Sequence, residues 1–219
     1  MELSNNYKKL VQLISDLDEK AVLEIVNELT NQKVDPISVF NVCYEGIREV
    51  GKRYQSEEYA ISGLIMAGDI IRKVSDILVP LFKYDRPKGN TGRILIGTVE
   101  GDIHYIGKDI FITLIKSHGY EVYDLGVDVA PPKFLTAIYE FKPDIIGLSC
   151  LISVAFESMQ ETIIFLKENV PRKIAPRAYI IGGNINQLIF ESTTADYFAK
   201  DAMEGVRLCD SIMNSDKGS

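Results

Sequence analysis

Cysteine is scarce in this 219-residue chain. The three cysteines, Cys43, Cys150 and Cys209, are too few and too widely spaced for a disulfide framework or a zinc knuckle. We expect each of them to be a buried, small apolar residue.

Long apolar runs and an excess of basic residues are also missing. No run approaches the roughly 20 apolar residues that span a bilayer. Residues 1–20 carry charges where a secretory signal would be apolar. We therefore expect a cytoplasmic protein with no membrane segment. The formal charge of −7 and the pI near 5.0 argue against a nucleic-acid partner, because binding phosphates requires a basic surface.

The composition is that of a globular protein, with 46% hydrophobic and 25% charged residues, and the length suits two modest domains. From Tyr7 to about Tyr84 the apolar residues recur at helical spacing, which predicts four helices packed as a bundle. Asp18 and the pair Asp35-Pro36 are expected to begin two of these helices.

A polar stretch rich in Gly and Pro, residues 85–92, predicts an interdomain linker. We place a helical domain at 1–88 and an α/β domain at 89–219. In the second domain, β-branched runs alternate with helical stretches, which predicts a doubly wound, five-stranded parallel sheet of the Rossmann or flavodoxin type. Its first three helices should begin near Ile106, at Pro131 and near Phe156.

Ligands of such sheets bind at the carboxyl ends of the strands, so the residues that follow each strand are candidates for function. The segment Gly101-Asp102-Ile103-His104-Tyr105-Ile106-Gly107 follows the first strand. Ser149 and Leu151 follow the third, and Gly182-Gly183 follows the fourth. We expect these three groups to meet at one edge of the sheet.

These residues resemble the D-x-H-x-x-G, S-x-L and G-G signature of the cobalamin-binding fold in methionine synthase, corrinoid methyl carriers and some mutases. Residues 51–73 are similar to the helical cap of the methyl-carrying members, so the resemblance covers nearly the whole chain. It implies that cobalamin binds with its own base displaced from cobalt, that His104 is the metal ligand and that the cofactor tail is buried in the α/β domain.

The residue types suit that chemistry on physical grounds. Cobalt in a corrin needs an axial donor, and a neutral imidazole is a suitable one. Asp102 could accept the other ring N–H of His104 and so fix its tautomer. Gly107, Gly182 and Gly183 leave room for the cofactor, Ser149 offers a hydroxyl, and Leu151 an apolar wall. The resemblance adds contacts from Gly101, Tyr105, Ile106 and Ala202, and Ser153 could bond the cofactor or support Asp102.

Each residue taken alone has a plainer interpretation. Asp102 could cap the following helix, His104 could be an ordinary loop or core histidine, and Ser149 could satisfy a strand-end amide. Gly182-Gly183 alone is a common turn. Their combination, in this order and after these strands, favours the corrinoid interpretation. His118 falls at a predicted helix C-terminus on the opposite edge of the sheet, and we assign it no function.

Three positions depart from the family pattern. Tyr105 stands where many relatives have Asp. In other relatives, a Ser or Thr a little beyond the S-x-L element completes a hydrogen-bond relay with the aspartate, and here only Ser153 is available for it. In the cap, Tyr59 or Tyr54 is the candidate for shielding the upper corrin face, where relatives have an aromatic residue followed by Leu-Pro.

The resemblance implies a carrier subunit with no catalytic residue of its own, which moves a methyl group from a substrate-specific methyltransferase to an acceptor methyltransferase acting on a thiol or tetrahydrofolate. A reductive activator is a further expected partner, and the 85–92 linker a possible hinge. The alternatives are a cobalamin-dependent mutase subunit, a cobalamin sensor, and a flavodoxin-like module that binds a flavin or a phosphoryl group.

Overall fold

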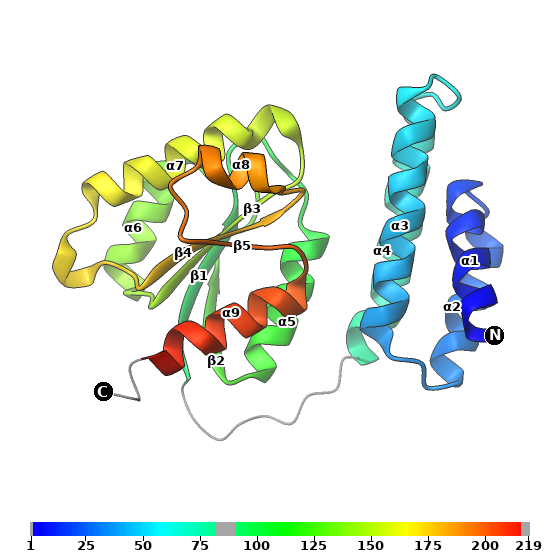
Figure 1. Cartoon of the computed structure of the whole chain (residues 1–219), viewed down its shortest axis with the longest axis horizontal. Helices are drawn as coiled ribbons and strands as arrows, with labels where there is room; N and C mark the ends of the chain where they lie inside the picture. The colour runs from blue at the N-terminus through cyan, green and yellow to red at the C-terminus, as the bar shows by residue number, and fades with distance from the viewer. Residues whose placement is uncertain (1, 82–90, 216–219) are drawn as a thin grey trace. The chain divides into compact units, whose positions relative to one another are not determined.

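The computed structural model describes residues 2–81 and 91–215 (Figure 1). The chain divides into two compact units, Met1–Lys83 and Tyr84–Ser219. Residues 85–90 of the predicted linker and hinge lie outside the described residues, as does the predicted domain boundary at 88.

The first unit is helical, as the apolar spacing predicts. Its helices are α1 (Glu2–Ser15), α2 (Glu19–Asn31), α3 (Pro36–Gln55) and α4 (Ile61–Leu78), followed by the 3₁₀ turn η1 (Val79–Leu81). The two predicted helix starts are confirmed. The carboxylate of Asp18 accepts a hydrogen bond from the Ala21 amide, and that of Asp35 accepts one from the Ser38 amide. Pro36 is the first residue of α3, where a missing N–H is tolerated.

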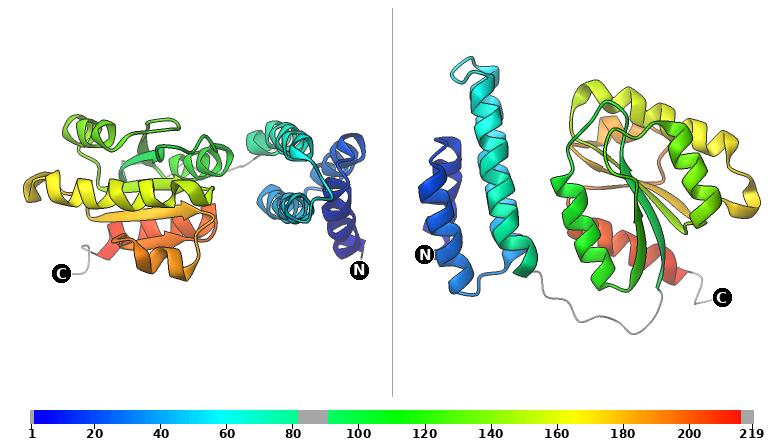
Figure 2. Two further views of the ribbon diagram at one scale, coloured as in Figure 1. Left: turned by 90° about the horizontal axis from the view of Figure 1, so that it is seen from above. Right: turned by 180° about the vertical axis from the view of Figure 1, so that it is seen from behind.

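The four helices pack as a bundle (Figures 1 and 2). Helix α1 contacts α2 and α3, and α4 contacts the same two helices. Removing the apolar stripes of all four from water is the main stabilising contribution to this unit. The buried residues include Leu10, Ile14, Val26, Leu29, Val39, Val50, Ile70, Val74 and Leu78.

One of the two tyrosines considered for shielding is held within the bundle. The Tyr59 hydroxyl donates to the Ser15 carbonyl at 2.8 Å, and the Arg53 guanidinium lies 5.6 Å from the centre of the Tyr59 ring. Arg53 also donates to the Ser15 carbonyl and to Asp16. Tyr59 is thus tied to the end of α1, whereas Tyr54 is exposed.

The second unit is a five-stranded parallel sheet with the order β2-β1-β3-β4-β5. The predicted alternation is confirmed, including helix starts at Ile106, Pro131 and Phe156. The strands are β1 (Gly92–Thr98), β2 (Tyr120–Asp124), β3 (Ile145–Cys150), β4 (Ala178–Gly183) and β5 (Tyr197–Ala199). The helices are α5 (Ile106–Ser117), α6 (Pro131–Phe141), α7 (Phe156–Asn169), α8 (Gln187–Ser192) and α9 (Ala202–Asn214), with 3₁₀ turns η2 (Ser153–Ala155) and η3 (Arg172–Ile174).

Helices cover both faces of this sheet. Helices α5 and α9 pack together on one face, and α6 and α7 on the other (Figure 1). The central strands β1, β3 and β4 are therefore almost entirely buried, which explains their continuous apolar runs. The order of the strands reverses between β1 and β3. In sheets of this kind, the crevice at the carboxyl ends of those two strands is the usual ligand site.

The three cysteines are free and buried, which confirms the sequence-based prediction. Across residues 2–81 and 91–215, no helix combines the length and the apolar character needed to cross a membrane.

Candidate functional site

The three sequence motifs meet at the carboxyl edge of the sheet. In the strand register, Thr98 at the end of β1 pairs with Ser149 of β3, and Ser149 pairs with Gly182 of β4. The next pair along is Cys150 with Gly183. The segment that contains Asp102 and His104 starts from the end of β1, so residues more than 80 positions apart become neighbours.

Asp102 lies beneath this edge with its side chain fully buried. One carboxylate oxygen, Oδ2, accepts hydrogen bonds from the amides of Leu151 at 2.6 Å and Ile152 at 3.3 Å. The other, Oδ1, accepts from the His104 amide at 2.9 Å. Burial opposes ionisation, but these hydrogen bonds and one from the His104 ring outweigh it, and the pKa of Asp102 is held below its ordinary value.

The helix-cap interpretation of Asp102 is wrong. Helix α5 begins after Tyr105, which makes no side-chain capping bond, and the carboxylate of Asp102 accepts none of the amides in the first turn of α5. Its partners are instead the amides that follow β3 and its neighbour His104. Asp102 therefore links the first and third sequence motifs.

His104 pairs with Asp102 through its ring. The distance from Nδ1 of His104 to Oδ1 of Asp102 is 2.6 Å. Because an ionised carboxylate only accepts hydrogen bonds, Nδ1 must carry the proton. In the neutral ring, Nε2 then carries the free lone pair, and within the described residues it has no hydrogen-bond partner. The His104 side chain is 49% exposed, so this nitrogen is available to a ligand.

Two further contacts hold the loop that carries His104. The buried Thr98 hydroxyl donates to the His104 carbonyl at 3.0 Å. The Gly101 amide donates to Oδ1 of Asp128 at 2.8 Å, and Gly101 has a φ of +84°, a conformation that favours glycine. Sequence reasoning missed Thr98 and Asp128, because neither belongs to a recognisable motif.

A buried ion pair lies just behind the loop, at the start of α5. The Lys108 side chain is only 2% exposed, and its Nζ lies 2.8 and 2.7 Å from the two carboxylate oxygens of Asp124 at the end of β2. Nζ also contacts Asp109 at 3.0 Å. The pair ties the first turn of α5 to the neighbouring strand. It was not foreseen from the sequence, where a lysine in this position is typical of an exposed helix face.

The glycine pair ends β4 beside the end of β3, and its two members have different surroundings. A β-carbon at Gly182 would have only the Ala199 carbonyl oxygen nearby, at 3.9 Å. A β-carbon at Gly183 would lie 2.0 Å from the Cys150 carbonyl oxygen, and Gly183 has a φ of +118°. Gly182 thus leaves room for another group, whereas Gly183 is required by the fold itself.

The remaining predicted residues are spread around the same edge. Ser149 and Leu151 are half-buried, and the Ser149 hydroxyl makes no hydrogen bond to any described residue, so it is not occupied with a strand-end amide. Ser153 is exposed at the start of η2 and is not one of the donors to Asp102. Ile106 and Gly107 form the first turn of α5, and Ala202 is the first residue of α9, directly after β5.

Large apolar side chains are exposed on the segments that follow β1, β3 and β4. They are Ile103, Tyr105, Val154 and Leu188. Exposed apolar side chains from three segments that follow strands of the sheet, together with an unpartnered imidazole nitrogen and the free space at Gly182, would suit a large, partly apolar ligand that the imidazole could bind. Across the described residues, no three His, Cys, Asp or Glu side chains are grouped as they are in a metal site built by protein alone.

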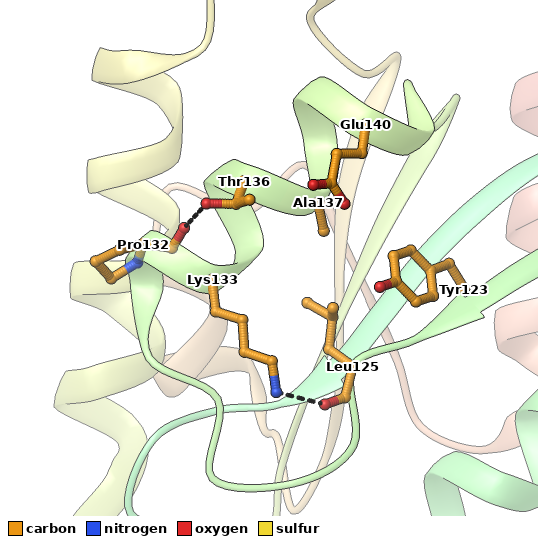
Figure 3. A pocket seen from close by; sticks show the side chains of 7 residues that line it. All are labelled: Tyr123, Leu125, Pro132, Lys133, Thr136, Ala137 and Glu140. Carbon is orange, nitrogen blue, oxygen red and sulfur yellow. Dashed lines mark hydrogen bonds between the residues drawn. The ribbon is translucent and has the colours of Figure 1, made fainter.

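Two other features lie away from this edge. His118 is the C-cap of α5 before β2 and contacts Asp210 through Nδ1 at 3.0 Å, which agrees with its predicted position at a helix C-terminus. An open pocket lies between β2 and α6, where Lys133 donates to the Leu125 carbonyl at 3.3 Å (Figure 3). No residue of the predicted site lines this pocket.

Comparison with known protein families gives two matches. Residues 92–206 match the B12 binding domain family, and residues 7–79 match a second family of the same description. The first match covers β1 to the middle of α9, and the second covers most of the helical unit.

Similar proteins match over nearly the whole length. A corrinoid protein of Desulfitobacterium hafniense is 32% identical over 94% of this chain and 96% of its own. Trimethylamine corrinoid protein 2 of Methanosarcina acetivorans is 30% identical over 88% of this chain and 89% of its own. The solved structure of the monomethylamine corrinoid protein of Methanosarcina barkeri has a TM-score of 0.84 at 21% identity, covering 95% of this chain and 99% of that one, which is a likeness of fold.

Proposed function

Since this chain belongs to the B12-binding corrinoid proteins of methyltransferase systems, we propose that it carries a methyl group on a cobalamin held at the carboxyl edge of its sheet, with His104 as the lower ligand of cobalt. The observation that carries this proposal is the pair formed by the buried carboxylate of Asp102 and the half-exposed imidazole of His104. Bound cobalamin supplies a cobalt centre that accepts a methyl group and gives it up again.

The protein's own contribution is to hold one proton in place. Asp102 accepts the Nδ1 proton of His104, so the Nε2 lone pair is the one directed to the ligand. The amides of Leu151 and Ile152 help to keep the carboxylate ionised, and an ionised carboxylate only accepts hydrogen bonds, so it favours the proton on Nδ1. A ligand whose tautomer and orientation are already set loses less entropy when it binds a metal.

The other site residues provide space and contact surface. Gly182 leaves open the position next to Ser149, whose hydroxyl is available to a polar group of the cofactor tail. Leu151, Ile106, Gly107 and Ala202 border the same edge. Exposed Ile103 and Tyr105 lie on either side of His104 in the chain, where they would exclude water from the ligand bond.

The proposed partners follow from methyl transfer between proteins. A substrate-specific methyltransferase would load the methyl group, and an acceptor methyltransferase would remove it to a thiol or to tetrahydrofolate. A reductive activator would restore the cofactor after oxidation. Similarity to corrinoid proteins named for trimethylamine supports a methylamine as one donor to test.

Isotope-edited electron paramagnetic resonance tests the lower ligand directly. The full-length protein, labelled with ¹⁵N only in histidine, is loaded with cobalamin and reduced to the paramagnetic Co(II) state. One coordinated ¹⁴N splits each cobalt line into a triplet, and one ¹⁵N splits it into a doublet. We expect doublets from the labelled protein and triplets from unlabelled protein.

The two histidines provide the matched controls. The variant His118→Gln should keep the doublets, and His104→Ala should lose them. Triplets from labelled wild-type protein would mean that the cofactor's own base stays on cobalt, and the lower-ligand proposal would then be wrong.

A further inference from the structure

The end of β1 and the first part of the loop that carries His104, from Thr98 to Asp102, are bonded to the loop that follows β2. The Thr98 amide donates to the Gly126 carbonyl and the Val129 amide donates to the Thr98 carbonyl, both at 3.0 Å. Val99 and Val129 form an isolated parallel bridge. The β2–α6 loop therefore continues the sheet beyond the last residue of β2 and flanks the start of the His104 loop.

Asp128 bonds to two residues of the His104 loop that lie beyond the Val99–Val129 bridge, Gly101 and Asp102. Its amide donates to the Asp102 carbonyl at 2.9 Å, and its Oδ1 accepts from the Gly101 amide at 2.8 Å. Asp128 has a φ of +53°, in the left-handed region that Asp and Asn tolerate better than other residues with a side chain. This conformation directs the amide and the carboxylate of one residue to two consecutive residues of the neighbouring loop.

We propose that Asp128 is a positioning residue, which holds the Gly101-Asp102 turn so that Asp102 presents Oδ1 to the ring of His104. This inference rests on the proposed role of His104. Asp102 is held at both its side chain and its main chain. Its Oδ2 accepts from the amides of Leu151 and Ile152, its carbonyl accepts from the Asp128 amide, and its own amide donates to the Val99 carbonyl at 3.1 Å. With both ends held, the remaining oxygen has one orientation, toward Nδ1 of His104.

Loss of the Asp128 carboxylate has a defined consequence for His104. Without the carboxylate of Asp128, the Gly101 amide loses its acceptor, while the main-chain bonds of Asp102 to residue 128 and to Val99 remain. Gly101 has a positive φ and no side chain, so its backbone torsions are the ones that this loss releases. Rotation there turns the Cα–Cβ bond of Asp102 relative to the fixed Oδ2. The 2.6 Å contact with Nδ1 then weakens, and a larger share of His104 carries its proton on Nε2.

Three substitutions of Asp128 distinguish the effect of its carboxylate from the effect of its backbone conformation. Asp128→Asn keeps an acceptor oxygen and tolerates the left-handed region. Asp128→Gly removes the acceptor but eases the conformation, and Asp128→Ala removes the acceptor and disfavours the conformation. The control is Asp144→Gly at the opposite edge of the same sheet, where Oδ2 accepts from the Arg93 amide at the same distance, 2.8 Å.

The test measures the tautomer of His104 in the full-length, cofactor-free protein. The ¹⁵N shifts of the imidazole nitrogens report the ratio of Nδ1–H to Nε2–H, read at alkaline pH where the ring is neutral and assigned with His118→Gln. We expect this ratio to fall about fivefold in Asp128→Gly and Asp128→Ala, the factor for loss of one hydrogen bond. It should stay near the wild-type value in Asp128→Asn and Asp144→Gly.

Several outcomes would overturn the proposal. The first is an unchanged ratio of Nδ1–H to Nε2–H in folded Asp128→Gly. The second is a fall of this ratio in Asp144→Gly as large as in Asp128→Gly. The third is a ratio in Asp128→Asn as low as in Asp128→Gly. If Asp128→Gly does not fold, hydrogen exchange of the wild-type Gly101 amide decides, because an amide exchanging as fast as an open loop would contradict the bond to Asp128. None of these measurements involves cobalt, so their failure is distinct from failure of the lower-ligand proposal.

Discussion

Gly183 lies so close to the main chain of Cys150 that a β-carbon on it would be 2.0 Å from the Cys150 carbonyl oxygen. The preceding glycine, Gly182, has no such neighbour, since its β-carbon would be 3.9 Å from the nearest atom, the Ala199 carbonyl oxygen. Glycine is thus present at the two positions of one G-G motif for different reasons: the fold requires it at Gly183, and it leaves space beside the site at Gly182.

Substitution of the second glycine should disrupt the fold. Gly183→Ala places a methyl group against backbone atoms that cannot move independently, at a φ of +118°. We expect the free energy of unfolding to fall by about 3–5 kcal/mol, measured by urea denaturation followed by circular dichroism. A loss below about 1 kcal/mol would show that the strand end is adaptable.

Substitution of the first glycine should affect only the ligand. In Gly182→Ala we expect the free energy of unfolding to change by less than about 1 kcal/mol. If the cofactor passes this position, cobalamin affinity should fall by about tenfold or more, which corresponds to 1.4 kcal/mol. Equilibrium dialysis with hydroxocobalamin measures the affinity. Unchanged binding would place the cofactor tail away from Gly182.

Asp102 should make the free energy of unfolding depend on pH in the acid range. Its pKa in the fold is below the ordinary value of 3.8, so the ionised carboxylate stabilises the fold above that pH, and the stabilisation is lost as pH falls through the folded pKa. Asp102→Asn should unfold about 1–3 kcal/mol more easily than wild type at pH 7, since buried amides lose a charged acceptor.

The pH dependence separates this effect from simple packing damage. The difference in unfolding free energy between wild type and Asp102→Asn should shrink as the pH falls below the ordinary pKa of 3.8, where the carboxylate of the unfolded wild-type chain is protonated first, and should vanish as the pH falls through the lower folded pKa. Glu121→Gln, a substitution on the exposed face of β2, should track wild type at every pH. A constant difference from pH 7 to pH 3 would contradict the assigned pKa direction.

Lys108 should stabilise the start of α5 through its buried charge. In Lys108→Met the side chain keeps much of its apolar length, but Asp124 loses its cation, so we expect a loss of about 1–3 kcal/mol in the free energy of unfolding. The control is Lys116→Met at an exposed position of the same helix, expected to change stability by less than about 0.5 kcal/mol. Equal effects from the two substitutions would mean that the ion pair contributes nothing beyond helix propensity.

The cysteines should be inert in the folded protein. Burial raises the pKa of Cys43, Cys150 and Cys209 to about 12 each, so the reactive thiolate is scarce at neutral pH. Iodoacetamide at pH 8 should leave all three unmodified in the native protein and should alkylate all three in urea, as counted by mass spectrometry. Rapid native labelling of Cys150 would show that the end of β3 opens to solvent.

Features that depend on neighbours in the chain were predictable from the sequence. Asp18 and Asp35 cap helices by bonding amides three residues away, and the start of α6 at Pro131 follows from the fixed backbone of proline. The Asp102–His104 contact is also local, spanning two residues. It could be proposed because both residue types and their spacing are visible in one loop.

Contacts between main-chain groups and distant side chains gave no signal of this kind. The amides of Leu151 and Ile152 hold Asp102 from about 50 positions away, and an amide is present at every residue except proline, so no residue type marks the partners. Asp128 and Asp124 read as ordinary loop and strand-end aspartates. Their contacts with Gly101 and Lys108 exist only because β2 lies beside β1.

The sequence by itself determined the helical and α/β classes, the edge of the sheet at which the candidate site residues lie, and the imidazole–carboxylate pair, because periodicity and short spacing encode local geometry directly. Only the tertiary structure decided which groups hold that pair, why the two glycines differ, and that Lys108 is buried. Those facts depend on which strands are neighbours and how closely their backbones approach, which in turn depends on the packing of the whole sheet.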